Sequence, residues 1–209
     1  NTVLDRWYNN FSNTAGTSFD PKICAHFLLH ALVFYQDRQL IAIISSIESE
    51  IKSQLNEQNE QSTSRRMSET ELNTLWEKYK EESYIIATAS PNDAAGSAHH
   101  AARLWRNTNG IDTGTINGLV KQICENNKKH IFFVDDFIGT GTKMVEFLTV
   151  DHFPSSSLYG FTNIKDVIEK YKSSVDFNIS VFAMCVEGQK KIDEKLPGLL
   201  NYYYGDLYT

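Results

Sequence analysis

Apolar and polar positions recur along the chain with two different periods, which predict a helical first third and then alternating strands and helices. Asp20 and Pro21 are residue types that begin a helix, and apolar residues follow them at helical spacing as far as Phe34. A second helix, from about Asp37, carries apolar residues on one face, namely Ile41, Ile44, Ile47, Ile51 and Leu55. Residues 56–68 are polar and are predicted to form a solvated loop. The sequence Ser-Glu-Thr-Glu at 68–71 is a capping box for a helix through Tyr79.

From Ser83 onwards, short apolar runs alternate with stretches of helical spacing. Four runs have the length and composition of buried strands: 84–87, 131–134, 179–186 and 199–204. Helices are predicted at 97–105, 115–125, 143–148 and 163–171, with a loop at 107–114. This order predicts an α/β fold with a parallel sheet, helices on both faces, and ligands bound beyond the carboxyl ends of the strands. We therefore divide the chain into an N-terminal helical layer, residues 1–82, and an α/β core, residues 83–209, within one compact unit.

Charge, hydropathy and cysteine usage narrow the class of protein. The net charge of −6 argues against a protein held to nucleic acid by bulk charge, although a local basic patch stays open. No apolar run reaches the roughly 20 residues that span a bilayer, and no signal peptide opens the chain, so we expect a cytoplasmic protein without membrane partners. Cys24, Cys124 and Cys185 lack metal-ligand spacing and are predicted to be core residues. The first residue is Asn1 rather than Met, which leaves open that the chain is part of a longer protein.

The run 131–143 (Ile-Phe-Phe-Val-Asp-Asp-Phe-Ile-Gly-Thr-Gly-Thr-Lys) is the strongest candidate for a functional site. A buried strand is predicted to end in Asp135 and Asp136, a Gly/Thr loop follows, and a helix begins at once. Glycines let the backbone approach a ligand closely, and the amides at a helix start suit a phosphate. The candidate phosphate ligands are therefore Gly139, Thr140, Gly141, Thr142 and Lys143. Carboxylates do not favour a phosphate, so Asp135 and Asp136 suit the next chemical unit, either vicinal sugar hydroxyls or a hydrated Mg²⁺.

Other interpretations of this run were weighed against the phosphate site. An apolar strand that ends in an acid also describes a Walker B strand, but the chain contains no G-x-x-x-x-G-K-[ST] motif. A dinucleotide-binding fingerprint fails as well, because G-x-G-x-x-G is absent. A plain strand, turn and helix with surface acids is the alternative that stays open.

The run resembles the phosphoribosyl-diphosphate-binding motif of type I phosphoribosyltransferases, which has four apolar residues, two acids, two apolar residues and a Thr/Gly loop. The resemblance implies that the catalytic pair Asp135 and Asp136 binds the ribose 2′ and 3′ hydroxyls, that residues 139–143 cradle the 5-phosphate, and that Mg²⁺ lies on the pyrophosphate. It also implies a pyrophosphate loop after the first core strand, where the chain offers Ser90, Asp93, Gly96 and Ser97. The helical preface and the core together resemble, more loosely, the phosphoribosyltransferase-like domains of bacterial conflict systems, including anti-phage retrons.

Three features depart from the family pattern. Gly139 stands where 6-oxopurine phosphoribosyltransferases carry an Asp that serves as base, which disfavours salvage of hypoxanthine or guanine. Lys143 stands where the family usually has Thr or Ser. The flexible lid of the family should fall between the first strand and the motif, and the loop predicted there, 107–114, is short.

These features favour a phosphoribosyl (glycosyl) transferase-like or related nucleotide-processing effector in bacterial antiviral defence, whose acceptor the sequence does not identify. Two alternatives stay open: a module that senses ribose phosphates or nucleotides without turnover, and an adaptor subunit that docks to a defence complex through its helical layer. Asp135→Asn with Asp136→Asn is predicted to remove ribose 5-phosphate binding from a folded protein. Gly141→Val is predicted to do the same by blocking the phosphate.

Several other polar residues are better explained by structure than by chemistry. His99 and His100 are predicted to lie on a helix surface or partly buried, and His26 and His30 to pack in the core or an interface, because neither pair has a third metal ligand at a recognisable spacing. Residues 128–130 (Lys-Lys-His) are predicted to form a solvated turn. The tyrosines at 202–204 could stack on a base, but a partly buried edge strand explains them better.

Overall fold

The computed structural model of the chain describes residues 35–89, 96–153 and 159–208. The chain divides into two units, Asn1–Gln36 and Asp37–Thr209, and every described helix and strand belongs to the second unit. The helix predicted from Asp20, with His26 and His30, lies outside the described residues. Among the described residues, no helix is both long enough and apolar enough to cross a membrane.

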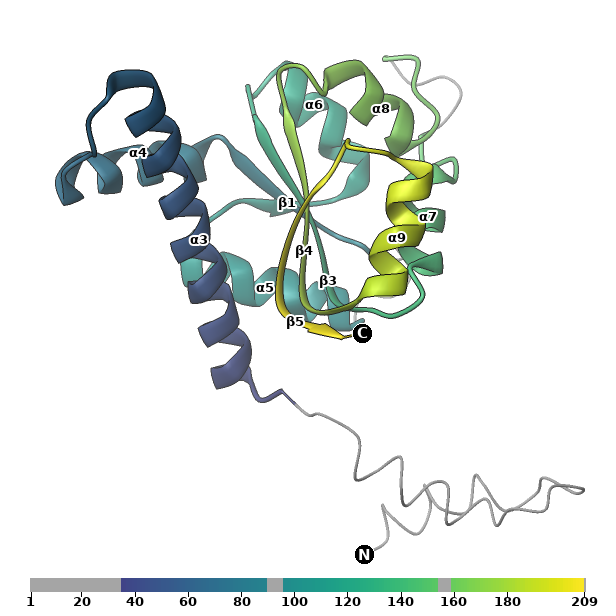
Figure 1. Cartoon of the computed structure of the whole chain (residues 1–209). Coiled ribbons are helices and arrows are strands. Elements are labelled where there is room, and N and C mark those ends of the chain that lie inside the picture. Colours follow the sequence, from purple (N-terminus) through teal and green to yellow (C-terminus); the bar gives the residue numbers. More distant parts are fainter. Residues whose placement is uncertain (1–34, 90–95, 154–158, 209) are drawn as a thin grey trace, which may run out of the picture. The chain divides into compact units, whose positions relative to one another are not determined.

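The second unit is built on one sheet of five parallel strands (Figure 1). The strands are β1 (Ser83–Ala87), β2 (Thr113–Gly114), β3 (His130–Ile138), β4 (Asp176–Cys185) and β5 (Asn201–Tyr208). Their order across the sheet is β2-β1-β3-β4-β5. Ile85 pairs with Phe132, and Asp135 pairs with Val181, so the strands predicted at these three places are parallel neighbours. The α/β fold predicted from the sequence is confirmed.

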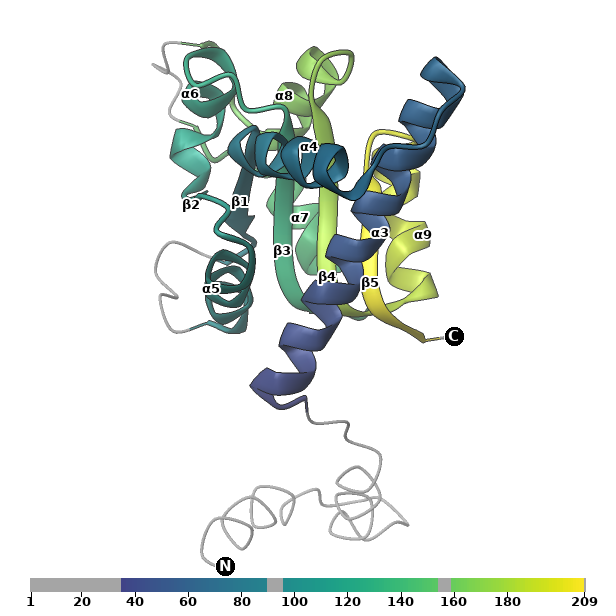
Figure 2. The same cartoon turned by 90° about the vertical axis from the view of Figure 1, so that its left-hand side faces the viewer.

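Helices cover both faces of the sheet. One face carries α3 (Asp37–Thr63), α4 (Glu69–Glu81) and α5 (Ser97–Asn109), which Figure 2 shows in front of the strands. The other face carries α6 (Leu119–Cys124), α7 (Thr142–Thr149), α8 (Ile164–Tyr171) and α9 (Val186–Lys195). A short 3₁₀ turn, Ile116–Gly118, leads into α6.

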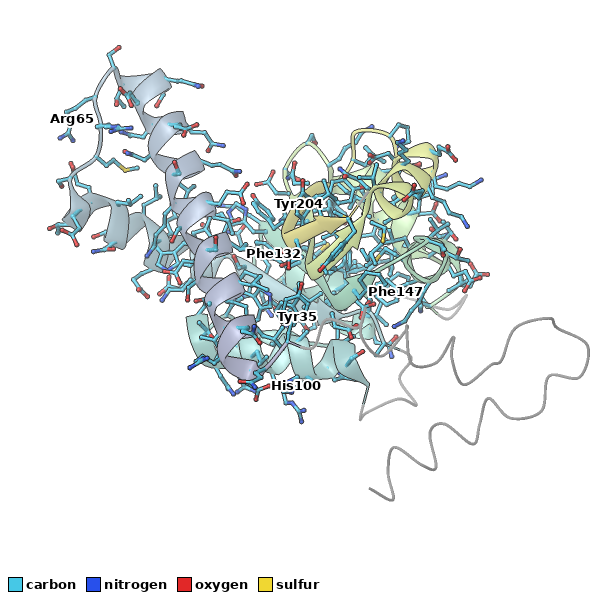
Figure 3. All side chains as sticks on the ribbon, turned by 60° about the horizontal axis from the view of Figure 1, so that its bottom comes forward. Tyr35, Arg65, His100, Phe132, Phe147 and Tyr204 are labelled. Atoms are coloured by element: carbon cyan, nitrogen blue, oxygen red, sulfur yellow. The ribbon has the colours of Figure 1, made fainter. Side chains whose placement is uncertain are left out.

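The central strand β3 is apolar on both sides because helices cover both faces of the sheet. Ile131 and Phe133 belong to the core on the side of α6 to α9. Phe132 faces the other layer, where its ring lies 5.9 Å from that of Trp105 in α5 (Figure 3). Burying a large apolar side chain contributes about 1.5–3 kcal/mol, so this strand is a main anchor of the fold and holds the run that follows it in place.

The polar segment 56–68 is helical as far as Thr63, so the predicted loop is wrong for 56–63 and is confirmed for 64–68. The segment contains neither Pro nor Gly. The hydroxyls of Ser62 and Thr63 donate to the Asn59 carbonyl at 3.0 and 2.7 Å, so the polar side chains support the last turn of α3. The chain leaves the helix only at Ser64, whose φ is 55°.

The two N-terminal helices otherwise follow the predicted pattern, with one shift. The capping box of α4 is confirmed, because Ser68 Oγ accepts from the Glu71 amide and the Glu71 carboxylate accepts from the Ser68 amide at 2.8 Å. In α3, Ile41 was assigned to the core face but is 41% exposed, whereas Leu40 is buried. The buried face of α3 consists of Leu40, Ile44, Ile47 and Ile51.

The α/β core departs from the predicted elements at three places. β3 continues past the two acids to Ile138 instead of ending at them, and it pairs with β4 on both sides of Asp136. The predicted loop 107–114 contains the last turn of α5 and the strand β2, because β2 pairs with β1. Residues 186–195 form the helix α9, which was not predicted because its N-cap, Cys185, makes no side-chain cap hydrogen bond and Gly188 lies in its first turn.

Two predictions about surface and core were also wrong. Lys128 is only 7% exposed, because its aliphatic stem is buried while Nζ donates to the Glu81 carbonyl at 2.7 Å and pairs with Asp112 at 3.2 Å. Cys124 is exposed and Cys185 is half-buried, so neither is a core residue; Cys24 lies outside the described residues.

Candidate functional site

The run 131–143 lies at the carboxyl edge of the parallel sheet, where ligands bind in such folds. β1 and β3 are parallel neighbours, and Ala87 pairs with Val134, so both strands lead to this edge. After β3 the chain turns at Gly139–Gly141 and enters α7 at Thr142. Gly141 caps the helix with a φ of 72°, a conformation that residues with a Cβ rarely adopt.

A small pocket of about 210 Å³ opens along this loop. Its lining consists of Asp135, Phe137, Ile138, Gly139, Thr140, Gly141, Thr142, Lys143 and Met144. One of the two predicted acids and all five predicted phosphate ligands therefore lie around one cavity. The first amides of α7 have no carbonyl partner within the helix, and the positive end of the helix dipole lies at the loop, so the pocket suits an anion.

Asp135 is the most constrained residue of the site. Its carboxylate is buried, accepts from Thr88 Oγ1 at 2.5 Å and pairs with Lys143 Nζ at 3.3 Å. Burial raises the pKa of Asp135, and the hydrogen bond from Thr88 and the charge of Lys143 offset that rise only in part. Thr88 follows β1 and Asp135 lies within β3, so this hydrogen bond joins the two central strands near the carboxyl edge of the sheet.

Asp136 has a different environment. The pairing of β3 with β4 skips Asp136, although Asp135 and Phe137 on either side of it are paired. Asp136 is half-buried, and its amide donates to Asp135 Oδ1 at 3.0 Å. The side chain of Asp136 also contributes to the raised pKa of Asp135, so the two carboxyl groups interact, and Asp136 is the more accessible of the two.

Two contributors to the site, Thr88 and Lys191, were missed at the level of sequence. Lys191 of α9 donates from Nζ to Thr142 Oγ1 at 2.6 Å, and Thr142 Oγ1 lies 3.1 Å from Thr140 Oγ1. No local motif connects Lys191 with residue 142, because 49 positions separate them.

The predicted pyrophosphate loop is described only in part. Ser90 and Asp93 lie outside the described residues. Gly96 caps α5 with an extended backbone, and Ser97 is the first residue of that helix. Because α5 packs on the face of the sheet opposite α7, these two residues enter the fold from that side.

The side chains around the loop fit a magnesium ion that arrives with its ligand. Within the described residues, no group of three or more His, Cys, Asp and Glu side chains could hold a metal. Asp135 is engaged by Lys143, which leaves the half-buried Asp136 as an available carboxylate. Mg²⁺ usually keeps several waters and binds through one or two carboxylates together with substrate phosphates, so Asp136 could hold it on a bound pyrophosphate.

The other polar candidates lie away from this loop. His100 is on the surface, where Nε2 lies 3.0 Å from Asp37 Oδ1 (Figure 3). β5 is an edge strand as predicted, with Tyr203 buried and Tyr202 donating to Asp193 at 2.6 Å.

A larger pocket, about 330 Å³, lies where β3, β4 and β5 begin. It is roughly 25 Å from the phosphate loop along β3. Asp176 and His130 line it at the strand starts, and no lysine or arginine does. A phosphate would meet a carboxylate there without a compensating cation, so we place the candidate site at the smaller pocket.

The raised pKa of Asp135 predicts how its contribution to stability depends on pH. The folded protein binds a proton at Asp135 more tightly than the unfolded chain does, so its contribution falls as the pH rises from 3.8 towards the raised pKa. The free energy of unfolding of the wild type minus that of Asp135→Asn should therefore be larger at about pH 4 than at about pH 8, measured by urea denaturation.

Glu71 provides a control of opposite sign. The hydrogen bond from Arg65, with those from Ser68, lowers the pKa of Glu71 to about 2. Its contribution should be lost as the pH falls, so the corresponding difference for Glu71→Gln should rise with pH at the acidic end. A pH-independent difference for Asp135→Asn would contradict the assignment.

Comparisons with known proteins place the chain in a family. The model of the PRTase-CE family matches residues 4–207, almost the whole chain. No curated protein matches the chain. Among solved structures, AQ2163 protein from Aquifex aeolicus is similar at 12% identity with a TM-score of 0.33, over 61% of this chain and 55% of that one. The chain thus spans about half the length of AQ2163, and a likeness at that score adds nothing to the site.

Proposed function

The chain belongs to the PRTase-CE family and has a phosphoribosyltransferase-like domain, and on that premise we propose that it binds a 5-phosphoribosyl compound at the loop 139–143. The compound we propose is phosphoribosyl diphosphate with Mg²⁺, from which the phosphoribosyl group is transferred to an acceptor. The observation that carries the proposal is the pocket along this loop. The pocket brings together the start of α7, the glycine turn, Lys143 and the buried Asp135, and Lys191 lies beside it through its hydrogen bond to Thr142.

The residues divide the work by charge. The loop amides, Thr140 and Thr142 would hold the 5-phosphate, which fixes the sugar over the sheet edge. Asp136, the accessible acid, would accept hydrogen bonds from the ribose hydroxyls, while Asp135 orients Lys143 and Thr88 around it. As pyrophosphate leaves, positive charge develops at the anomeric carbon and negative charge on the leaving group, and Mg²⁺ would stabilise the latter.

Calorimetric titration tests this proposal directly. Phosphoribosyl diphosphate with Mg²⁺ and ribose 5-phosphate are both expected to bind, whereas ribose, which has no phosphate for the loop, is not. Adding EDTA should weaken the binding of phosphoribosyl diphosphate far more than that of ribose 5-phosphate, because Mg²⁺ is expected to lie on the pyrophosphate. If neither phosphoribosyl diphosphate nor ribose 5-phosphate binds, the proposal is overturned. Release of pyrophosphate when a base is added would show turnover.

One observation favours a second candidate, a ligand sensor without turnover. Between β1 and β3, the described residues 96–129 are taken up by α5, β2, the 3₁₀ turn and α6, with only short connections. That leaves no long loop there to close over a bound ligand, and a lid excludes water and completes a transferase site. Tight binding without pyrophosphate release in the presence of any base would favour the sensor.

We further propose that the protein acts as an effector or adaptor in a bacterial antiviral defence system. The support is the resemblance of the helical preface and the core, taken together, to domains of such systems. Co-expression with the products of neighbouring genes, followed by size-exclusion chromatography, tests it. A protein that stays alone, and whose deletion leaves phage sensitivity unchanged, would contradict the role.

A further inference from the structure

The start of α9 packs directly on the phosphate-binding loop. A Cβ at Gly188 would collide with the Gly139 carbonyl oxygen, and a Cβ at Gly141 would lie 2.5 Å from the Gly188 carbonyl oxygen. Glycines on both sides therefore let two backbones meet. Lys191 follows Gly188 by three positions, and residues three apart share a helix face, so this close approach carries Lys191 to the loop.

The hydrogen bond of Lys191 fixes the direction of the hydroxyls in the pocket. An ammonium group can only donate, so Thr142 Oγ1 is the acceptor in the 2.6 Å contact with Lys191 Nζ. Thr142 then keeps its own proton for Thr140 Oγ1, which is 3.1 Å away, or for a ligand. The ammonium has three donors and uses one here, so two remain for an anion.

The two lysines at the loop differ in the charge that they can offer. Lys143 lies 3.3 Å from Asp135 Oδ2, so its charge is compensated by a buried carboxylate. Within the part of the chain that the structure describes, Lys191 makes no ion pair with a carboxylate. Of the two lysines hydrogen-bonded or ion-paired at this loop, Lys191 of α9 is therefore the one whose ammonium has no carboxylate within ion-pair distance among the described residues.

We propose that Lys191 binds the phosphate directly and supplies the charge that selects a dianionic phosphate monoester, while Lys143 mainly holds Asp135. This inference rests on the proposed function, since it concerns the same loop. It places the specificity of the site in an element that contacts the motif only in the tertiary structure.

The test compares Lys191→Met with Lys190→Met, an exposed neighbour on the same helix. Each variant and the wild type are titrated with ribose 5-phosphate, a dianion, and with its phosphate methyl ester, a monoanion. Lys191→Met should weaken the binding of ribose 5-phosphate by about 10-fold to 100-fold, which is the effect of losing one charge-assisted hydrogen bond. The affinity of Lys191→Met for the methyl ester should fall by a smaller factor. Lys191→Arg should retain part of the affinity for ribose 5-phosphate. The affinity of Lys190→Met should stay within about twofold of that of the wild type.

The outcomes separate this inference from the function that it rests on. If the wild type binds ribose 5-phosphate and Lys191→Met matches Lys190→Met, Lys191 is no phosphate ligand and the inference fails while the function stands. Equal losses for both ligands would assign Lys191 a structural role only, which also overturns it. If the wild type binds neither ligand, the proposed function fails and the inference with it.

Discussion

The double variant Asp135→Asn, Asp136→Asn is expected to remain folded and to bind ribose 5-phosphate or phosphoribosyl diphosphate at least about 100-fold more weakly than the wild type. Each carboxylate that accepts from a ligand hydroxyl or holds Lys143 contributes about 1.5–3 kcal/mol, so two of them account for a loss of this size. Folding should survive because Asn has the shape of Asp and can still accept from Thr88 Oγ1. The buried charge that is lost at Asp135 was itself costly.

Calorimetry on the double variant, with thermal unfolding alongside, measures both parts of this expectation. Asp176→Asn is the matched control, because it makes the same chemical change where β4 begins, at the opposite edge of the sheet. Its affinity should equal that of the wild type. Unchanged binding by the double variant would mean that the acids are structural and that the run 131–143 is no ribose site.

Gly141→Ala is expected to lower the free energy of unfolding by about 2–5 kcal/mol. The left-handed backbone at φ 72° costs a residue with a Cβ about 1–2 kcal/mol, and forcing the Cβ against the Gly188 carbonyl at 2.5 Å adds about 1–3 kcal/mol. Valine is larger and should cost more. A Cβ at Gly141 points at α9, so Gly141→Val is expected to destabilise the fold in addition to the predicted loss of phosphate binding, which stays a prediction.

Gly110→Ala separates these two contributions. Gly110 caps the end of α5 with the same φ of 72°, but a Cβ there would meet nothing within 4 Å. Urea denaturation should show a loss of about 1–2 kcal/mol for this variant, the backbone cost alone. Equal losses at Gly110 and Gly141 would show that α9 does not press on the loop.

Local features of the sequence were sufficient for much of the fold and for the core of the candidate site. The capping box at Ser68 could be predicted from the sequence because its two hydrogen bonds join residues three positions apart. The apolar run before Asp135 could be predicted to form a central strand because such a strand is apolar on both faces. The run 139–143 could be predicted to turn into a helix and to suit a phosphate. The conformational freedom of glycine and the free amides at a helix start both depend only on residues next to one another in the sequence.

The tertiary structure decided the features that depend on distant residues. The polar residues at 56–63 are compatible with a loop or with a solvated helix. The helix forms because α3 packs on the sheet through Ile44, Ile47 and Ile51, and helical stability comes mostly from such packing. The partners of the site are likewise distant in sequence. Thr88 lies 47 positions from Asp135, and Lys191 lies 49 positions from Thr142.

The sequence therefore determined which residues could bind a phosphate, since that depends on the local backbone. It did not determine which of them carry an uncompensated charge, because the buried position of Asp135 and the approach of α9 through Gly188 arise only when the strands and helices pack. Charge compensation depends on distances of a few ångströms between side chains, and only the packed fold sets those distances.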